Sequence, residues 1–146
     1  LLVMPPVAHG QGSGHDIPDA FSDREGSHQT SLGLFLTDST YQGGNGYSLR
    51  LHGLSKGFNE SALRRLIVMH GAPYVNPLAA MAMGRLGRSW GCPAVRREVA
   101  KPMIDTLKLG QFIYSHGPGT EKLSQCKTEN LSLAAIPPES SPQDAR

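Results

Sequence analysis

Residues 67–95, IVMHGAPYVNPLAAMAMGRLGRSWGCPAV, decide how this chain is interpreted. The stretch begins with an apolar, β-prone run that ends at His70 and continues through a glycine-rich turn to Cys92, 22 positions later. Cysteine acyl-transfer chemistry needs a thiol and an imidazole, because the imidazole takes the thiol proton and later returns it. We therefore predict that the fold brings His70 and Cys92 together.

The residues around Cys92 favour a reactive thiol. Ser89, Trp90 and Gly91 precede it in a turn whose backbone amides can converge on a developing oxyanion. An amphipathic helix is predicted over residues 93–109, directly after the cysteine, and amides at a helix start lower the pKa of a thiol. A lone cysteine is more often a small buried hydrophobe, and that alternative stays open at this point.

His70 precedes Gly71, and no acidic side chain lies within residues 67–95. A backbone carbonyl, for example that of Gly71, is therefore expected to orient the imidazole. A histidine at the end of an apolar run can also be a core residue satisfied by backbone groups. If His70 is paired with Cys92, its imidazole is the natural general base for the thiol.

Other residues of the stretch are candidates for substrate contacts. Arg85 and Arg88 could hold a substrate carboxylate through paired N–H bonds, or they could lie in a solvated turn. Tyr74 and Trp90 could line a cleft, although a lone aromatic residue is more often part of a core. Ser89 could donate a hydrogen bond near the thiolate.

Composition limits the function classes. A chain of 146 residues holds one domain with a core, and its 17 glycines and 11 prolines favour a turn-rich β fold. A net charge of +2 without a basic helix argues against nucleic acid as a partner. Cys92 and Cys126 lie in unlike settings, so we treat them as unrelated thiols rather than a disulfide. The first residues, LLVMPPV, are too short for a membrane span or a signal segment, so any export signal would lie upstream.

Local patterns predict a mainly β domain with short helices. Glycines between residues 37 and 47 predict a hairpin, a cap followed by proline predicts a helix start at residue 76, and Gly110 ends the last helix. A long polar loop is expected over 19–31, and a mobile polar tail over 118–146 that adds little to the core. The expected strands are 1–8, 32–37, 47–51, 66–69 and 112–115, and the expected helices are 76–83, 93–109 and a short helix or turn at 59–65.

Zinc chemistry is a weaker alternative. His9 and Asp16 could form half of a zinc site, and with His70 they could serve a zinc peptidase. The sequence contains neither an H-E-x-x-H motif nor a close cysteine pair. We predict no metal and no cofactor.

The segments HG at 70–71 and GRSWGCPAV at 87–95 resemble the L,D-transpeptidase (YkuD-like) catalytic domain, whose motif is His-Gly, a spacer, then Ser/Thr-His-Gly-Cys. The chain looks most like the murein branch that lacks the second histidine. Here Trp90 takes that place, the spacer is longer by a few residues, and Pro93, Ala94 and Val95 replace the Asn or Arg often found after the cysteine. Further similar segments are VAHGQGSG at 7–14, FSDREGS at 21–27, SLGLFLT at 31–37 and LRLHGL at 49–54.

The resemblance implies an L,D-transpeptidase-like β-sandwich or barrel of mixed sheets over residues 1–117, which begins inside the family's domain. It implies a cysteine acyltransferase, exported to the periplasm or cell wall, that acts on peptidoglycan stem peptides without a metal. The thiolate attacks a tetrapeptide stem at its third residue, D-Ala leaves, and an amine of a second stem resolves the thioester. The implied catalytic residues are Cys92 as nucleophile, His70 as base, Ser89 in support and Gly91 in an oxyanion hole with the amides of Trp90 and Cys92; the substrate-binding candidates are Gly71, Tyr74, Arg88 and Trp90.

Two alternatives remain beside the transpeptidase. Water could resolve the thioester, which would make the protein an L,D-carboxypeptidase. The substitution of Trp90 for the motif histidine also leaves room for a non-catalytic module that binds stem peptides. The sequence does not decide the oligomeric state.

Overall fold

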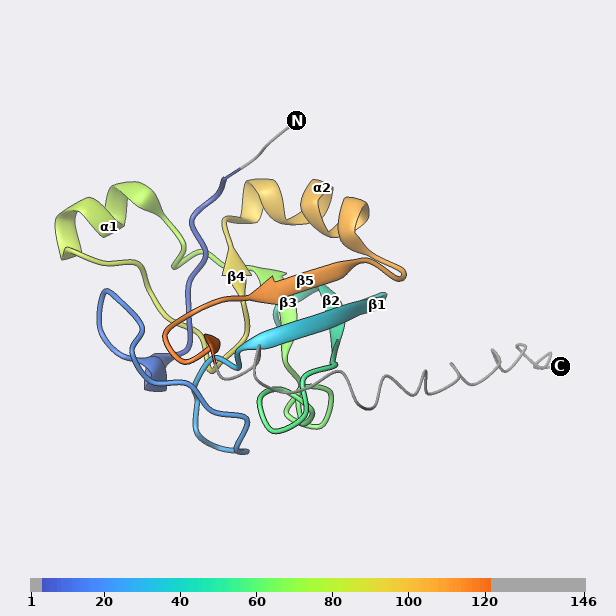
Figure 1. The fold of residues 1–146 in the computed structure, drawn as a ribbon. Helices are drawn as coiled ribbons and strands as arrows, with labels where there is room; N and C mark the ends of the chain where they lie inside the picture. The colour runs from blue at the N-terminus through green and yellow to red at the C-terminus, as the bar shows by residue number, and fades with distance from the viewer. Residues whose placement is uncertain (1–3, 122–146) are drawn as a thin grey trace, which may run out of the picture.

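The computed structural model describes residues 4–121, which form a curled, mixed, five-stranded sheet in the order β4-β3-β2-β1-β5 (Figure 1). Neighbouring strands run antiparallel except β3 and β4, which are parallel. The predicted mainly β fold with short helices is confirmed, and the sheet has the shape of a half-barrel. The strands are β1 (Gly33–Gly43), β2 (Gly46–Gly53), β3 (Val68–Gly71), β4 (Ala94–Val95) and β5 (Phe112–Ser115).

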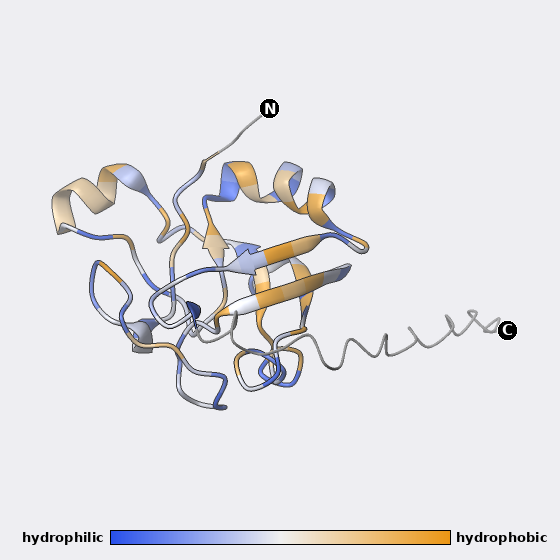
Figure 2. Cartoon of the chain, in the orientation of Figure 1, coloured by the Kyte–Doolittle hydropathy of each residue, from blue (hydrophilic) through white to orange (hydrophobic). Residues whose placement is uncertain are grey.

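The hairpin of β1 and β2 is the longest paired unit of the sheet, and it confirms the hairpin that the glycines predict. Gly43 pairs with Gly46 across the turn, and Gly46 has a φ of 78°, a left-handed conformation that glycine adopts without strain. The register shifts between Thr37 and Thr40, which marks a bulge. Figure 2 shows hydrophobic residues concentrated on the strands and hydrophilic residues in the connecting loops.

Helix α2 (Arg97–Leu107) packs on the sheet and completes the main core. Ile104 of this helix is fully buried and belongs to one cluster with Leu49 and Leu51 of β2. A second cluster around Ala94 and Val75 fills the space near β4. Both strands that carry the central stretch are therefore held from two sides by apolar contacts.

Helix α1 (Pro77–Met83) confirms the predicted capping. The side chain of Asn76 accepts hydrogen bonds from the amides of Leu78 and Ala79, Pro77 is the first helical residue, and Gly84 ends the helix at a φ of 72°. None of its side chains is buried. A short 3-10 helix, η1 (Gln11–Ser13), precedes the sheet.

The predicted helix over 93–109 begins too early. Ala94 and Val95 form β4 because their backbone pairs with β3, so α2 starts only at Arg97. Cys92 is therefore not at a helix start. This correction changes the expected electrostatics of its thiol.

Two further expectations are corrected, and a third is settled in favour of one of its alternatives. Residues 4–8 form no strand, since Pro5 and Pro6 lack an amide proton, and only Ala8 makes a bridge, with Ala94. β3 starts at Val68, because Leu66 has a φ of 56° and is exposed. Residues 59–65 form the turn alternative, because the Asn59 side chain is buried and holds Ser55 and Leu34 instead of capping a helix. Residues 1–3 and the predicted tail beyond residue 121 lie outside the described part of the chain.

Candidate active site

His70 and Cys92 lie on the two segments that the parallel pair of strands joins. His70 pairs with Ala94 in the β3–β4 register, and its amide donates to the carbonyl of Pro93 at 3.3 Å. Cys92 thus lies two residues before the direct partner of His70. The pairing of β3 with β4 places both candidate catalytic residues near the β4 edge of the sheet, with Cys92 level with Val68 and outside the lining of the cleft beside His70.

The His70 ring is oriented by a backbone carbonyl, as predicted. Its Nδ1 lies 3.1 Å from the Gly71 carbonyl oxygen, and a carbonyl only accepts, so Nδ1 carries the proton. The neutral ring therefore presents an unprotonated Nε2, which has no hydrogen-bond partner within residues 4–121. Burial lowers the pKa of His70, while the hydrogen bond to Gly71 acts in the opposite direction. The ring is thus neutral over a wider pH range than an exposed histidine.

The Cys92 thiol rests against the backbone of β3 and the turn before it. Its Sγ accepts from the Val68 amide at 3.5 Å and donates to the Leu66 carbonyl at 3.5 Å. No hydrogen bond joins it to His70 in the part of the chain that the structure describes. Burial raises the pKa of Cys92, an effect that the Val68 amide and the positive charge of Arg65 only reduce. The prediction that a helix start lowers the pKa of the Cys92 thiol is therefore wrong, because α2 begins only at Arg97.

Ser89 and Gly91 shape the turn that carries the thiol. The Ser89 hydroxyl donates to the Cys92 carbonyl at 2.6 Å and accepts from the Gly91 amide at 3.1 Å. The proton of Ser89 thus goes to the backbone of Cys92 and not to its sulfur. Gly91 has a φ of 113°, and a Cβ there would lie 2.7 Å from the Gln29 carbonyl oxygen. The amides of Trp90 and Cys92 have no hydrogen-bond partner among the described residues.

Arg65 is a residue of the site that the sequence analysis missed. Its side chain is only 4% exposed, lies 3.6 Å from the carboxylate of Asp23, and donates to the carbonyls of Ser22 and Gln29 at 2.9 and 2.8 Å. It also reaches the hydroxyls of Ser27 and Ser31. Arg65 therefore holds residues 22–31 against the turn at Gly91. The segment that contains it, NESALRR, predicts only a short helix or turn, so no local signal marks Arg65.

Trp90 and Arg88 lie on the outer side of the same turn. Trp90 is 71% exposed, and its ring stacks on that of His28 with centroids 4.9 Å apart. The stack joins the turn to residues 22–31 a second time. Arg88 donates to the carbonyl of Gly14, and Arg85 donates to the carbonyl of Leu86, so both guanidinium groups have backbone partners.

A cleft of about 450 Å³ opens beside His70. Its lining includes Gly71, Tyr74, Arg97 and Lys101. Burial raises the pKa of Tyr74, and the negative charge of a Cys92 thiolate would raise it further. The position of Tyr74 in this lining agrees with the prediction that it lines a cleft. Gly71 is needed there, because a Cβ would lie 2.8 Å from the Cβ of Ala100 on α2.

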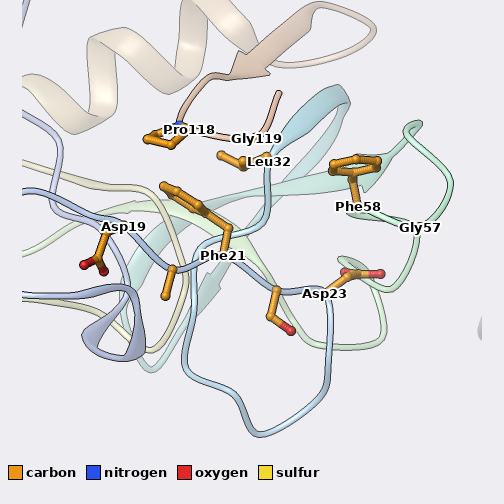
Figure 3. Close-up of a pocket in the computed structure, with 10 residues that line it drawn as sticks. Asp19, Phe21, Asp23, Leu32, Gly57, Phe58, Pro118 and Gly119 are labelled. Carbon is orange, nitrogen blue, oxygen red and sulfur yellow. The ribbon is translucent and has the colours of Figure 1, made fainter. Parts of the chain in front are cut away.

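Other cavities of the described residues are distinct from this cleft. One of about 290 Å³ on the inner side of the sheet is lined by Gly91 and Pro93, which flank Cys92 in the chain. Another cavity, of about 430 Å³, is lined by the rings of Phe21 and Phe58 together with Leu32 and Asp23 (Figure 3). Neither His70 nor Cys92 lines that third cavity.

The zinc alternative finds no ligand set within residues 4–121. No group of three or more His, Cys, Asp or Glu side chains there could hold a metal ion. The two ring nitrogens of His9 instead face the carbonyls of Gly10 and His15. In the same residues, no helix has the length and apolar character to cross a membrane.

Replacing Gly91 with alanine tests the turn geometry. Gly91→Ala should reduce the free energy of unfolding by about 1–3 kcal/mol, because it combines a positive φ with a backbone clash. Urea denaturation measures the change. Gly44→Ala is the matched control, since a Cβ there meets no atom within 4 Å, and it should change stability by under about 0.5 kcal/mol. Equal effects of the two variants would contradict the proposed constraint.

The resting protonation state of Cys92 can be measured by alkylation. In a Cys126→Ser background, the rate with iodoacetamide should keep rising above pH 9.0, the ordinary pKa of the thiol, because burial favours the protonated form. The same protein unfolded in urea provides the ordinary titration as a control. A rate that levels off near neutral pH would show instead a thiolate stabilised in the resting protein.

Comparison with known proteins adds one finding. A model of the L,D-transpeptidase catalytic domain matches residues 1–116, which is most of the chain. Neither a curated protein nor a solved structure matches it. The match includes β3 with His70, the turn with Cys92, and all five strands of the sheet. The chain belongs to the L,D-transpeptidase catalytic domain family.

Proposed function

We propose that the protein is a peptidoglycan L,D-transpeptidase that uses Cys92 as nucleophile and His70 as general base. The observation that supports the proposal is the β3–β4 pairing, which sets the segment of Cys92 next to the strand of His70, whose Nε2 is unprotonated and without a partner among the described residues. The family match over residues 1–116 supports the reaction class. The catalytic unit would be residues 1–117, followed by a polar tail.

The first half-reaction forms a thioester. Nε2 of His70 takes the thiol proton, and the thiolate attacks the carbonyl carbon of the third residue of a tetrapeptide stem. The C–N bond to the terminal D-Ala breaks, and the imidazolium returns its proton to the leaving amine. Because the resting thiol donates to Leu66, this step requires the sulfur to exchange that carbonyl for the imidazole. Such catalytic hydrogen bonds are often absent before substrate binds.

The second half-reaction resolves the thioester. The amine of a second stem attacks the acyl carbon and gives its proton to His70. The C–S bond then breaks, and the imidazolium returns that proton to the departing sulfur, which restores the thiol. The free amides of Trp90 and Cys92 are suited to stabilise the oxyanion in both steps, whereas the Gly91 amide is already bound to Ser89. Ser89 thereby acts by holding the turn. Trp90 and Tyr74 would contact the substrate, as would Gly71; Arg88 would do so only if it releases Gly14.

The substrate class implies a location. Peptidoglycan stems lie outside the cytoplasm, so we propose an exported protein of the periplasm or cell wall. The partner is the stem peptide, and the proposed chemistry requires no metal or cofactor. Water in place of the acceptor amine would give L,D-carboxypeptidase activity through the same thioester.

A non-catalytic stem-peptide module is the second candidate. It is favoured by the raised pKa of Cys92 and by the hydrogen bond of its thiol to Leu66. In that case stem peptides would bind, but no covalent intermediate would form. The two candidates differ in whether Cys92 can be acylated.

Exposure to a carbapenem followed by intact-mass spectrometry tests acylation. The wild-type protein and Cys126→Ser should each gain one covalent adduct, and Cys92→Ser should gain none, because only Cys92 has the predicted base and amides. The Cys126 variant is the matched control for thiol loss. An adduct that survives in Cys92→Ser, or its absence from folded wild type, would contradict the proposal.

The role of His70 is tested by His70→Gln, which keeps a polar side chain but cannot act as a base. Acylation should slow by roughly 10²- to 10⁴-fold. In the wild type the rate should fall only below pH 6.5, since burial lowers the pKa of His70 and keeps the ring neutral above that value. The variant should lack this acid limb. Unchanged pH profiles in stopped-flow measurements would remove His70 from the mechanism.

A further inference from the structure

We infer that Arg97 binds the free carboxylate of the residue that leaves the acyl donor, and so selects stems that end directly after the scissile bond. The inference rests on the proposed function and deepens it. It assigns to Arg97 the carboxylate contact that the sequence suggests for Arg85 and Arg88.

Arg97 lies against the backbone next to the catalytic base. It is the first residue of α2, and a Cβ on Gly71 would lie 3.2 Å from its Cα and 3.6 Å from its Cγ. Gly71 directly follows His70, and its carbonyl oxygen accepts a hydrogen bond from Nδ1 of the His70 ring. The Arg97 side chain thus starts beside the residue that orients the imidazole.

Arg97 also lines two clefts that share residues. The cleft beside His70 and a second cleft of about 450 Å³ toward α1 both include Arg97, Ala72 and Pro73. The two clefts therefore adjoin at Ala72 and Pro73, just past the end of β3, and form one groove that Arg97 lines. In the proposed complex the donor stem would extend from Cys92, which lines neither cleft, into this groove.

Arg97 differs from the other cationic side chains near the site, Lys101 and Arg65, because each of those has an acidic partner. Lys101 lines the same cleft but bonds to Asp105 at 2.5 Å. Arg65 is buried in its own network. Among residues 4–121, Arg97 makes no hydrogen bond or ion pair, and the lining of the His70 cleft includes no Asp or Glu. An unpaired cation in a cleft without acidic residues favours an anionic ligand.

The second cleft adds an observation that points the same way. The Nε of Arg96 is buried and has no hydrogen-bond partner in the described structure. Buried polar atoms are usually paired, so an acceptor in this groove would satisfy it. Glu98 is the one acidic residue in the lining of this cleft, and the lining of both clefts together otherwise carries only positive charge.

The chemistry of the donor identifies the carboxylate. In the leaving D-amino acid a single carbon separates the carboxylate from the scissile nitrogen, which must receive a proton from His70. A cation that binds this carboxylate must therefore lie close to the base, and Arg97 lines the same cleft as His70. A guanidinium can bind a carboxylate with two parallel N–H bonds, which fixes orientation as well as position.

The test compares two acyl donors: a tetrapeptide stem with a free terminal D-Ala, and the same peptide with a terminal carboxamide. Wild type should prefer the free acid by about tenfold or more in kcat/KM, as expected for a charge-assisted hydrogen-bonded pair. Arg97→Gln should remove this preference by raising KM for the acid donor alone. Arg97→Lys should keep part of it, because the charge remains but the paired geometry is lost.

Arg24→Gln is the matched control, since Arg24 is exposed, lies in a loop and lines none of the clefts. It should keep the full preference. Wild type that processes both donors equally, or Arg97→Gln that keeps the preference, would overturn the role of Arg97 while leaving the transpeptidase intact. If no donor is processed and no adduct forms on Cys92, the proposed function fails and this inference fails with it.

Discussion

The buried guanidinium of Arg65 is the interaction on which the candidate site depends. A charge that is 96% removed from solvent is stable only when it is paired and hydrogen-bonded, and Arg65 meets this need with Asp23 and with carbonyls and hydroxyls of residues 22–31. Those residues form no helix or strand, so the guanidinium replaces the regular hydrogen bonding that they lack. The turn before Cys92 then packs on a fixed surface.

The second constraint is the short parallel ladder between β3 and β4. Two residue pairs suffice to place Cys92 beside the strand of His70, since the flanking turn is fixed by Ser89, by Gly91 and by contact with Gln29. The same ladder delays the start of α2 to Arg97. The segment of Cys92 thus lies beside the strand of His70, and the thiol lacks the helix terminus that would have lowered its pKa.

The resulting electrostatics separate the resting state from the reacting one. Burial raises the pKa of Cys92 and lowers that of His70, so both groups are neutral at rest. A neutral pair cannot begin attack until a proton moves, and a bound substrate that excludes water would favour that movement. Under the proposed function, the thiol would therefore stay protonated until a stem peptide binds. This behaviour would follow from the two burial effects together.

The sequence alone determined the features that local patterns encode. These are the β1–β2 hairpin, the capping of α1 and the orientation of His70 by the Gly71 carbonyl, because turns, caps and adjacent residues act over a few positions of chain. Tertiary structure decided the start of α2, the burial of Arg65, the protonated thiol and the free guanidinium of Arg97. Each of these features depends on desolvation, or on pairing between strands that are distant in the chain. A local sequence pattern does not reveal which distant residues will surround a side chain.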